Sequence, residues 1–180
     1  MKALGKGSIA SIVRVGLQIA WVVLWVLLGV LIVAAIGYGL LPALVASGVL
    51  SPETFSGAGI SWRIVVPAFC IGVVAIAGAL IIVWRLKRLF DSFTSGEPFR
   101  RENAGHLRVI WITMMVIELA KYALLALTGA LLTGDNGVDL KARYSLNIDV
   151  STWGSILILI VLAEVFREGA RLKEEQELTI

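Results

Sequence analysis

The chain has 180 residues, of which 58% are hydrophobic and only 16% are charged. Soluble domains are roughly 45–50% apolar, so this composition excludes an ordinary soluble domain and indicates a protein of the lipid bilayer. The net charge of +3 would be compatible with nucleic-acid binding. However, the basic residues flank the apolar runs as orienting signals, so we expect no direct contact with nucleic acid.

The apolar runs predict one membrane domain over residues 1–180, of the all-α class, with four transmembrane helices. Crossing the hydrocarbon takes about 20 apolar residues. Helices are expected at about 15–41, 64–84 with a continuation to 94, 107–133 and 151–178. The first run is too long for the core of a secretory signal peptide. Pro42 is expected to end this first helix.

The distribution of lysine and arginine predicts the orientation of these helices. Twelve of these residues flank the N-terminus, the 85–108 loop and the tail, whereas three flank the other two loops. Loops rich in Lys and Arg stay on the cytoplasmic side. We therefore expect a multi-pass protein of the cell membrane, with both termini in the cytoplasm and the lipid bilayer as a partner.

The loop between the second and third helices is amphipathic. Apolar residues recur at helical spacing, at Leu86, Leu89, Phe90 and Phe93. They predict a cytoplasmic extension of the second helix that rests on lipid headgroups. Gly96 is expected to end this extension, and Pro98 and Phe99 begin the segment that leads into the third helix. Asn103 can bond a free backbone group near the start of the third helix.

Two charged residues lie inside the third helix. Glu118 lies about 15 Å along the helix from Arg108, near the midplane of the bilayer. Lys121 follows three positions later on the same face, so the two can pair. Each would cost roughly 2.5–3.5 kcal/mol if it were unpaired at the centre of a membrane. An internal structural pair and a role in sensing or transport both remain open.

The segment 140–150 alternates between apolar and polar residues without interruption. Period two over eleven residues predicts a strand. Because a single strand is not stable alone, it needs a partner such as residues 54–60. The sequence therefore predicts a small extracytoplasmic β element beside the helices.

The tail, residues 163–178, is predicted to be a second cytoplasmic amphipathic extension. Arg171 lies three residues after Glu168 and four before Glu175, so it can pair with both. Gly169 leaves a notch that, together with Glu164, allows this helix to pack on the loop at 95–103. The acidic end of the tail is repelled by the anionic inner leaflet and is expected to meet a protein instead.

Two segments resemble a known family. The first is Ser95-Gly96-Glu97-Pro98-Phe99 with Glu102-Asn103 and Leu107-Arg108. The second is residues 162–170 with Leu172, Glu174-Glu175-Gln176 and Leu178-Thr179-Ile180. Both are similar to segments of the bacterial four-helix membrane family catalogued as domain of unknown function 2975. The resemblance implies a four-helix membrane fold and, because members are often encoded beside a small helix-turn-helix regulator, a cytoplasmic DNA-binding partner.

The sequence shows no enzyme constellation, and we expect no catalytic residue, cofactor or metal. Its one cysteine, Cys70, lies within an apolar run, and its one histidine, His106, has no second ligand near it. Our first hypothesis is a regulatory membrane protein that holds or antagonises a cytoplasmic partner. Its docking surface would comprise Gly96, Pro98, Phe99, Asn103, Glu164, Phe166, Gly169, Glu175 and Leu178. A purely structural role for these residues, as a scaffold, is an equally good interpretation. The alternative function is a small, homo-oligomeric transporter or channel that uses Glu118 and Lys121.

Overall fold

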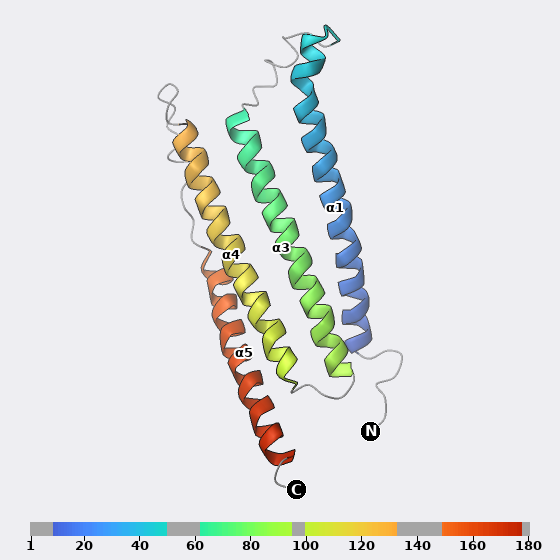
Figure 1. Ribbon diagram of the computed structural model, residues 1–180, viewed down its shortest axis with the longest axis vertical. Coiled ribbons are helices and arrows are strands. Elements are labelled where there is room, and N and C mark those ends of the chain that lie inside the picture. The colour runs from blue at the N-terminus through green and yellow to red at the C-terminus, as the bar shows by residue number, and fades with distance from the viewer. Residues whose placement is uncertain (1–8, 50–61, 95–99, 133–148, 178–180) are drawn as a thin grey trace. The chain divides into compact units, whose positions relative to one another are not determined.

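The computed structural model describes residues 9–49, 62–94, 100–132 and 149–177. These ranges hold four helices in chain order, α1 (Ile9–Ala46), α3 (Trp62–Thr94), α4 (Arg101–Leu132) and α5 (Val150–Glu177) (Figure 1). All four are long and apolar enough to cross a bilayer, by length and composition. The expectation of four helices that are able to span a membrane is confirmed, and every regular element in the described ranges is a helix.

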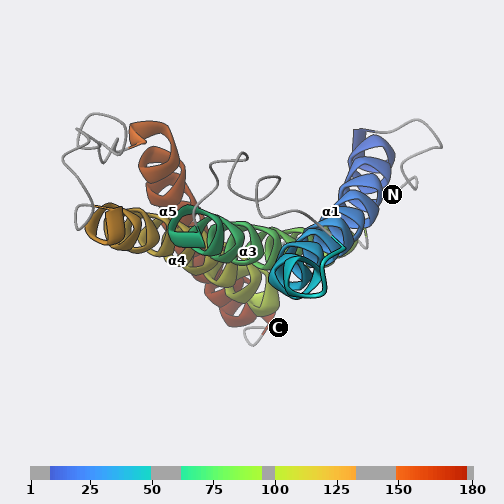
Figure 2. The same cartoon turned by 90° about the horizontal axis from the view of Figure 1, so that it is seen from above.

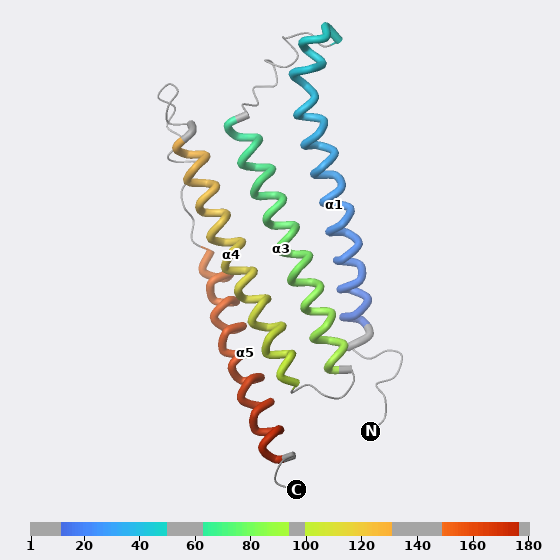
Figure 3. The backbone as a smooth tube through the Cα atoms, in the orientation of Figure 1, coloured from blue at the N-terminus to red at the C-terminus, as the bar shows by residue number. Residues whose placement is uncertain are grey.

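The first helix does not end at Pro42. α1 includes this proline and continues to Ala46 (Figure 3). Gly48 then adopts φ +78, and its N–H donates to the carbonyl of Val45 at 3.1 Å. The N–H of Val49 donates to the carbonyl of Leu44, also at 3.1 Å. These two bonds form a Schellman motif, which satisfies the last helical carbonyls and stops the helix at a glycine rather than at the proline.

The predicted outer strand is not found where the structure can test it. Residues 140–148 and the proposed pairing segment 54–60 lie outside the described residues, and no strand occurs within the described ranges. Val150, expected to be the last strand residue, is the first residue of α5. The reason is a helix cap: Asp149 accepts hydrogen bonds from the Ser151 N–H at 3.0 Å and the Thr152 hydroxyl at 2.6 Å.

The described residues group into two compact units. Unit 1 comprises Met1–Leu24, Ala77–Glu118 and Ile148–Ile180, and therefore all of α5. Unit 2 comprises Trp25–Ile76 and Leu119–Asn147. Within unit 2, α1 approaches α3 at a glycine: a Cβ on Gly72 would lie 3.2 Å from Cδ1 of Leu31. Close approach at small residues is how membrane helices commonly pack.

Unit 1 contains the hydrophobic core cluster. Its buried centre is formed by Leu89 of α3, Leu107 of α4 and Ala163 of α5. Partly buried apolar residues pack around that centre: Leu86, Phe93, Trp111, Leu159 and Phe166. α4 and α5 run side by side in this unit (Figure 2). The core therefore joins the C-terminal part of α3, the N-terminal part of α4 and α5.

Candidate functional site

The polar residues of unit 1 surround this core, beginning with a buried amide. Asn103, in the first turn of α4, is only 1% exposed. Its Nδ2 donates to Oγ of Ser92 near the end of α3 at 2.5 Å. The sequence placed Asn103 correctly at a helix start but predicted a backbone partner. In the structure, this side chain joins two helices through Ser92, and the backbone partner stays a prediction.

The N-terminal part of α1 is attached to α3 by polar contacts that sequence reasoning missed. Arg14 forms an ion pair with Asp91 at 3.0 Å. Lys87 donates to Oε1 of Gln18 at 2.7 Å, and its ammonium lies 5.5 Å from the ring centroid of Trp21. Lys87 and Asp91 lie four residues apart on α3, which places them on one face of that helix. This spacing was the only feature of the sequence that could have indicated the contacts, because the partners of Lys87 and Asp91 on α1 lie about 70 residues away in the chain.

One face of α5 is fixed to the core. The rings of Phe166 and Phe93 have centroids 5.9 Å apart. Ala163 and Ala170, two turns apart, are both buried. Gly169 is half-buried beside them. The stripe of Ala163, Phe166, Gly169 and Ala170 packs α5 against α3 and α4, and this packing fixes the rotation of α5 about its axis.

Beyond this stripe, the C-terminal end of α5 carries exposed charges. Every residue from 171 to 176 is exposed. Arg171 pairs with Glu168 at 2.8 Å and with Glu175 at 3.3 Å, which confirms the predicted pairing. Glu174 reaches Arg101 of α4 at 3.6 Å. Leu172 stands among these charges and is 50% exposed.

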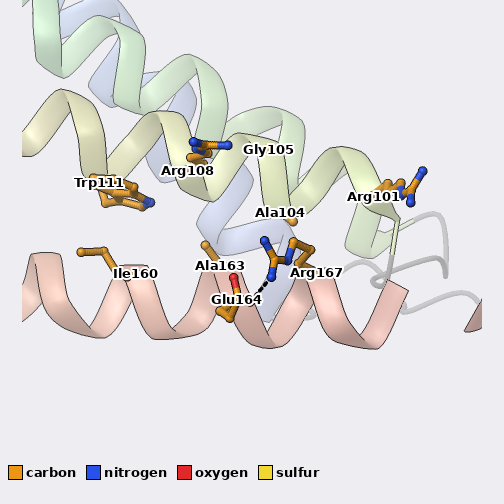
Figure 4. A pocket seen from close by; sticks show the side chains of 9 residues that line it. All are labelled: Arg101, Ala104, Gly105, Arg108, Trp111, Ile160, Ala163, Glu164 and Arg167. Carbon is orange, nitrogen blue, oxygen red and sulfur yellow. Dashed lines mark hydrogen bonds and ion pairs between the residues drawn. The ribbon is translucent and has the colours of Figure 1, made fainter. Parts of the chain in front are cut away.

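A cleft of about 450 Å³ lies between α4 and α5. From α4 it is lined by Arg101, Ala104, Gly105, Arg108 and Trp111, and from α5 by Ile160, Ala163, Glu164 and Arg167. Figure 4 shows Trp111 and Ile160 facing each other at one end, and the ion pair of Glu164 with Arg167 toward the other. Glu164 thus belongs to the predicted surface and to this cleft.

His106 lies in a second, polar cleft of about 340 Å³ between α3 and α4. Nδ1 of His106 lies 3.2 Å from Nη1 of Arg85, and because a guanidinium can only donate, the ring nitrogen accepts. No group of three or more His, Cys, Asp or Glu side chains suited to a metal occurs among the described residues.

The predicted docking residues fall into three groups. Glu164 and Glu175 are exposed on α5, whereas Asn103, Phe166 and Gly169 lie wholly or partly inside the packing of unit 1. The remaining members, Gly96, Pro98, Phe99 and Leu178, lie outside the described residues. Of the described docking residues, only Phe166 packs against the core cluster, and the two glutamates lie on the exposed surface of α5.

The two intramembrane charges lie on α4, as predicted. Glu118 is buried, with 7% exposure, and Lys121 is half-buried with its ammonium 5.1 Å from the ring centroid of Tyr122. A carboxyl group on a spanning helix that is covered by protein faces neighbouring helices rather than lipid. The Glu118–Lys121 ion pair itself stays a prediction.

Comparison with known proteins decides the family. A family model described as "Protein of unknown function (DUF2975)" matches residues 60–180. The chain belongs to this family. The match covers more than half of the sequence and includes α3, α4, α5 and both segments that carry the resemblance. No curated protein and no solved structure matches the chain.

Proposed function

We propose that this DUF2975 protein is a non-enzymatic regulatory membrane protein whose α5 docks a cytoplasmic protein. The observation that carries the proposal is the exposed, charged end of α5. A helix with charges on all sides at 171–176 does not suit the hydrocarbon of a bilayer. Its buried stripe at Ala163, Phe166 and Ala170 holds it in one orientation, as a preformed recognition helix requires.

The chemistry of this helix end indicates a protein partner. Acidic residues are repelled by anionic lipids, so Glu174 and Glu175 point to a partner with basic residues. Leu172 supplies an apolar contact in the middle of the charged surface. A small DNA-binding regulator of the helix-turn-helix class has a basic surface of this kind, and its basic face would be unavailable to DNA while it is docked.

The test is copurification of a helix-turn-helix regulator encoded beside the gene, from solubilised membranes that contain variants of the full chain. Leu172→Asp combined with Glu175→Lys should abolish capture, because it removes the exposed apolar contact and reverses an acidic charge. Both side chains are exposed outside the core cluster, so α5 should keep its packing. Leu157→Ala is the matched control, since Leu157 is an exposed apolar residue on the same helix outside the charged segment. Undiminished capture by the double variant would show that the tail is scaffold.

A second candidate is a transporter or channel subunit that acts through Glu118. The burial of this carboxyl on a membrane-spanning helix favours it. The discriminating variant is Glu118→Gln with Lys121→Met, which removes both charges while nearly keeping their volumes. A transporter would lose solute flux in this variant. A docking protein would keep its partner.

A further inference from the structure

The cleft between α4 and α5 has an excess of positive charge that the docking proposal does not use. Its lining holds three arginines and one carboxylate. Arg167 is paired with Glu164, and Arg101 has a longer contact, 3.6 Å, with Glu174. The side chain of Arg108 makes no hydrogen bond or ion pair with any residue in the described part of the chain. The cleft therefore offers a ligand the unpaired guanidinium of Arg108 and the weakly paired guanidinium of Arg101.

The cleft is also open at its middle. A Cβ built on Gly105 would meet no atom within 4 Å, so the space beside this residue is empty. Ala104 and Ala163 add only methyl groups to the walls. A small anionic group can therefore approach the backbone of α4 between Arg101 and Arg108, which lie two turns apart, or about 10 Å along the helix.

One end of the cleft is apolar. Trp111 and Ile160 face each other there, one turn beyond Arg108 on α4 and one turn before Glu164 on α5 (Figure 4). Both helices thus change from charged to apolar in the same direction along the cleft. A free anion gains nothing from that gradient, whereas a phospholipid has a charged headgroup continuous with an acyl chain.

We propose that this cleft binds the phosphate of an anionic phospholipid, with the headgroup at Arg101 and Arg108 and an acyl chain passing Trp111 and Ile160. A guanidinium binds phosphate oxygens through two parallel hydrogen bonds, which favours arginine at such a site. The ion pair of Arg167 with Glu164 forms the opposite wall and limits the positive charge. The proposal is independent of partner docking, because it concerns the cleft and not the exposed end of α5.

The experiment measures lipid binding to the full chain in detergent, by native mass spectrometry and by thermal unfolding. Phosphatidylglycerol should remain bound and raise the melting temperature, whereas zwitterionic phosphatidylcholine should do neither. Inorganic phosphate is the third arm. A stabilisation by inorganic phosphate equal to that by phosphatidylglycerol would assign the site to free phosphate and overturn the lipid proposal.

Three variants separate a defined site from general surface charge. Arg108→Gln should weaken phosphatidylglycerol binding about tenfold, the loss expected for a charge-assisted contact. Gly105→Leu should weaken it comparably by filling the cleft while every charge is kept. Glu164→Gln should strengthen binding, because it releases Arg167. Arg88→Gln is the matched control, since Arg88 lies outside this cleft. An equal loss in Arg88→Gln, or full binding in Gly105→Leu, would overturn the proposal.

Discussion

Asn103 is the residue on which the polar packing of unit 1 depends. Its amide is buried and bonded to Ser92, so removing it leaves a polar group on α3 that has lost a partner. We expect Asn103→Leu to destabilise the protein by about 0.5–1.5 kcal/mol, the net contribution of a hydrogen bond to stability. Thermal unfolding in nanodiscs measures this loss. The exposed Gln176→Leu is the control, and an equal effect of both changes would contradict a structural role for Asn103.

At the scale of residues, the sequence revealed contacts that are local in the chain. Each of the two glutamates lies about one turn from Arg171, so helical spacing alone predicted their pairing. The pair of Arg14 with Asp91 joins residues 77 positions apart, and no local pattern contains it. Likewise, Arg101, Arg108 and Arg167 were counted among the basic residues that orient the helices, and only the packing of α4 on α5 revealed that they line one cleft.

At the scale of elements, Gly78 sets how closely α3 approaches α4 within unit 1. A Cβ on Gly78 would lie 2.7 Å from Cγ1 of Ile117 and 3.4 Å from Cγ2 of Thr113. Gly78→Leu should therefore force the helices apart and cost about 1–3 kcal/mol, the range for overpacking. Gly16→Leu is the control, because a Cβ at Gly16 meets nothing within 4 Å. Similar melting temperatures for both variants would argue against this contact.

The start of α5 offers another test at this scale. Asp149 caps the helix through Ser151 and Thr152, and substituting such a cap typically costs about 1 kcal/mol. Asp149→Ala should lower the melting temperature and increase hydrogen exchange in the first turn of α5. Asp149→Asn, which keeps a capping oxygen, should restore most of the stability. Loss of stability in both variants would indicate a role for the charge rather than the cap.

The four helices were predictable because each contains a long run of mostly apolar residues, a pattern that the bilayer imposes. The residues at which these helices begin and end were not predictable from the apolar pattern. Pro42 was the expected stop of α1, but the helix stops at Gly48, whose φ of +78 favours glycine. Alternation at 140–150 extended the predicted strand to Val150, because Asp149, Val150 and Ser151 at the start of the helix also alternate in polarity. In both places, local capping chemistry outweighed the pattern.

At the scale of the whole molecule, the four spans and the charge distribution predict one topology. An even number of crossings returns the chain to the side from which it started. The basic residues of unit 1, at the N-terminal part of α1, the end of α3 and the start of α4, then lie with the charged end of α5 on the cytoplasmic side. Both the docking surface and the lipid cleft depend on this arrangement.

Cysteine labelling from the two sides of the membrane tests this arrangement most directly. In a Cys70→Ala background, single cysteines replace two exposed residues, Ser47 after α1 and Lys173 on α5. A membrane-impermeant maleimide is then added to intact and to permeabilised cells. We predict that Ser47→Cys is labelled in intact cells, whereas Lys173→Cys is labelled only after permeabilisation. Labelling of Lys173→Cys in intact cells would place the charged C-terminal end of α5 outside the cell and contradict the predicted topology.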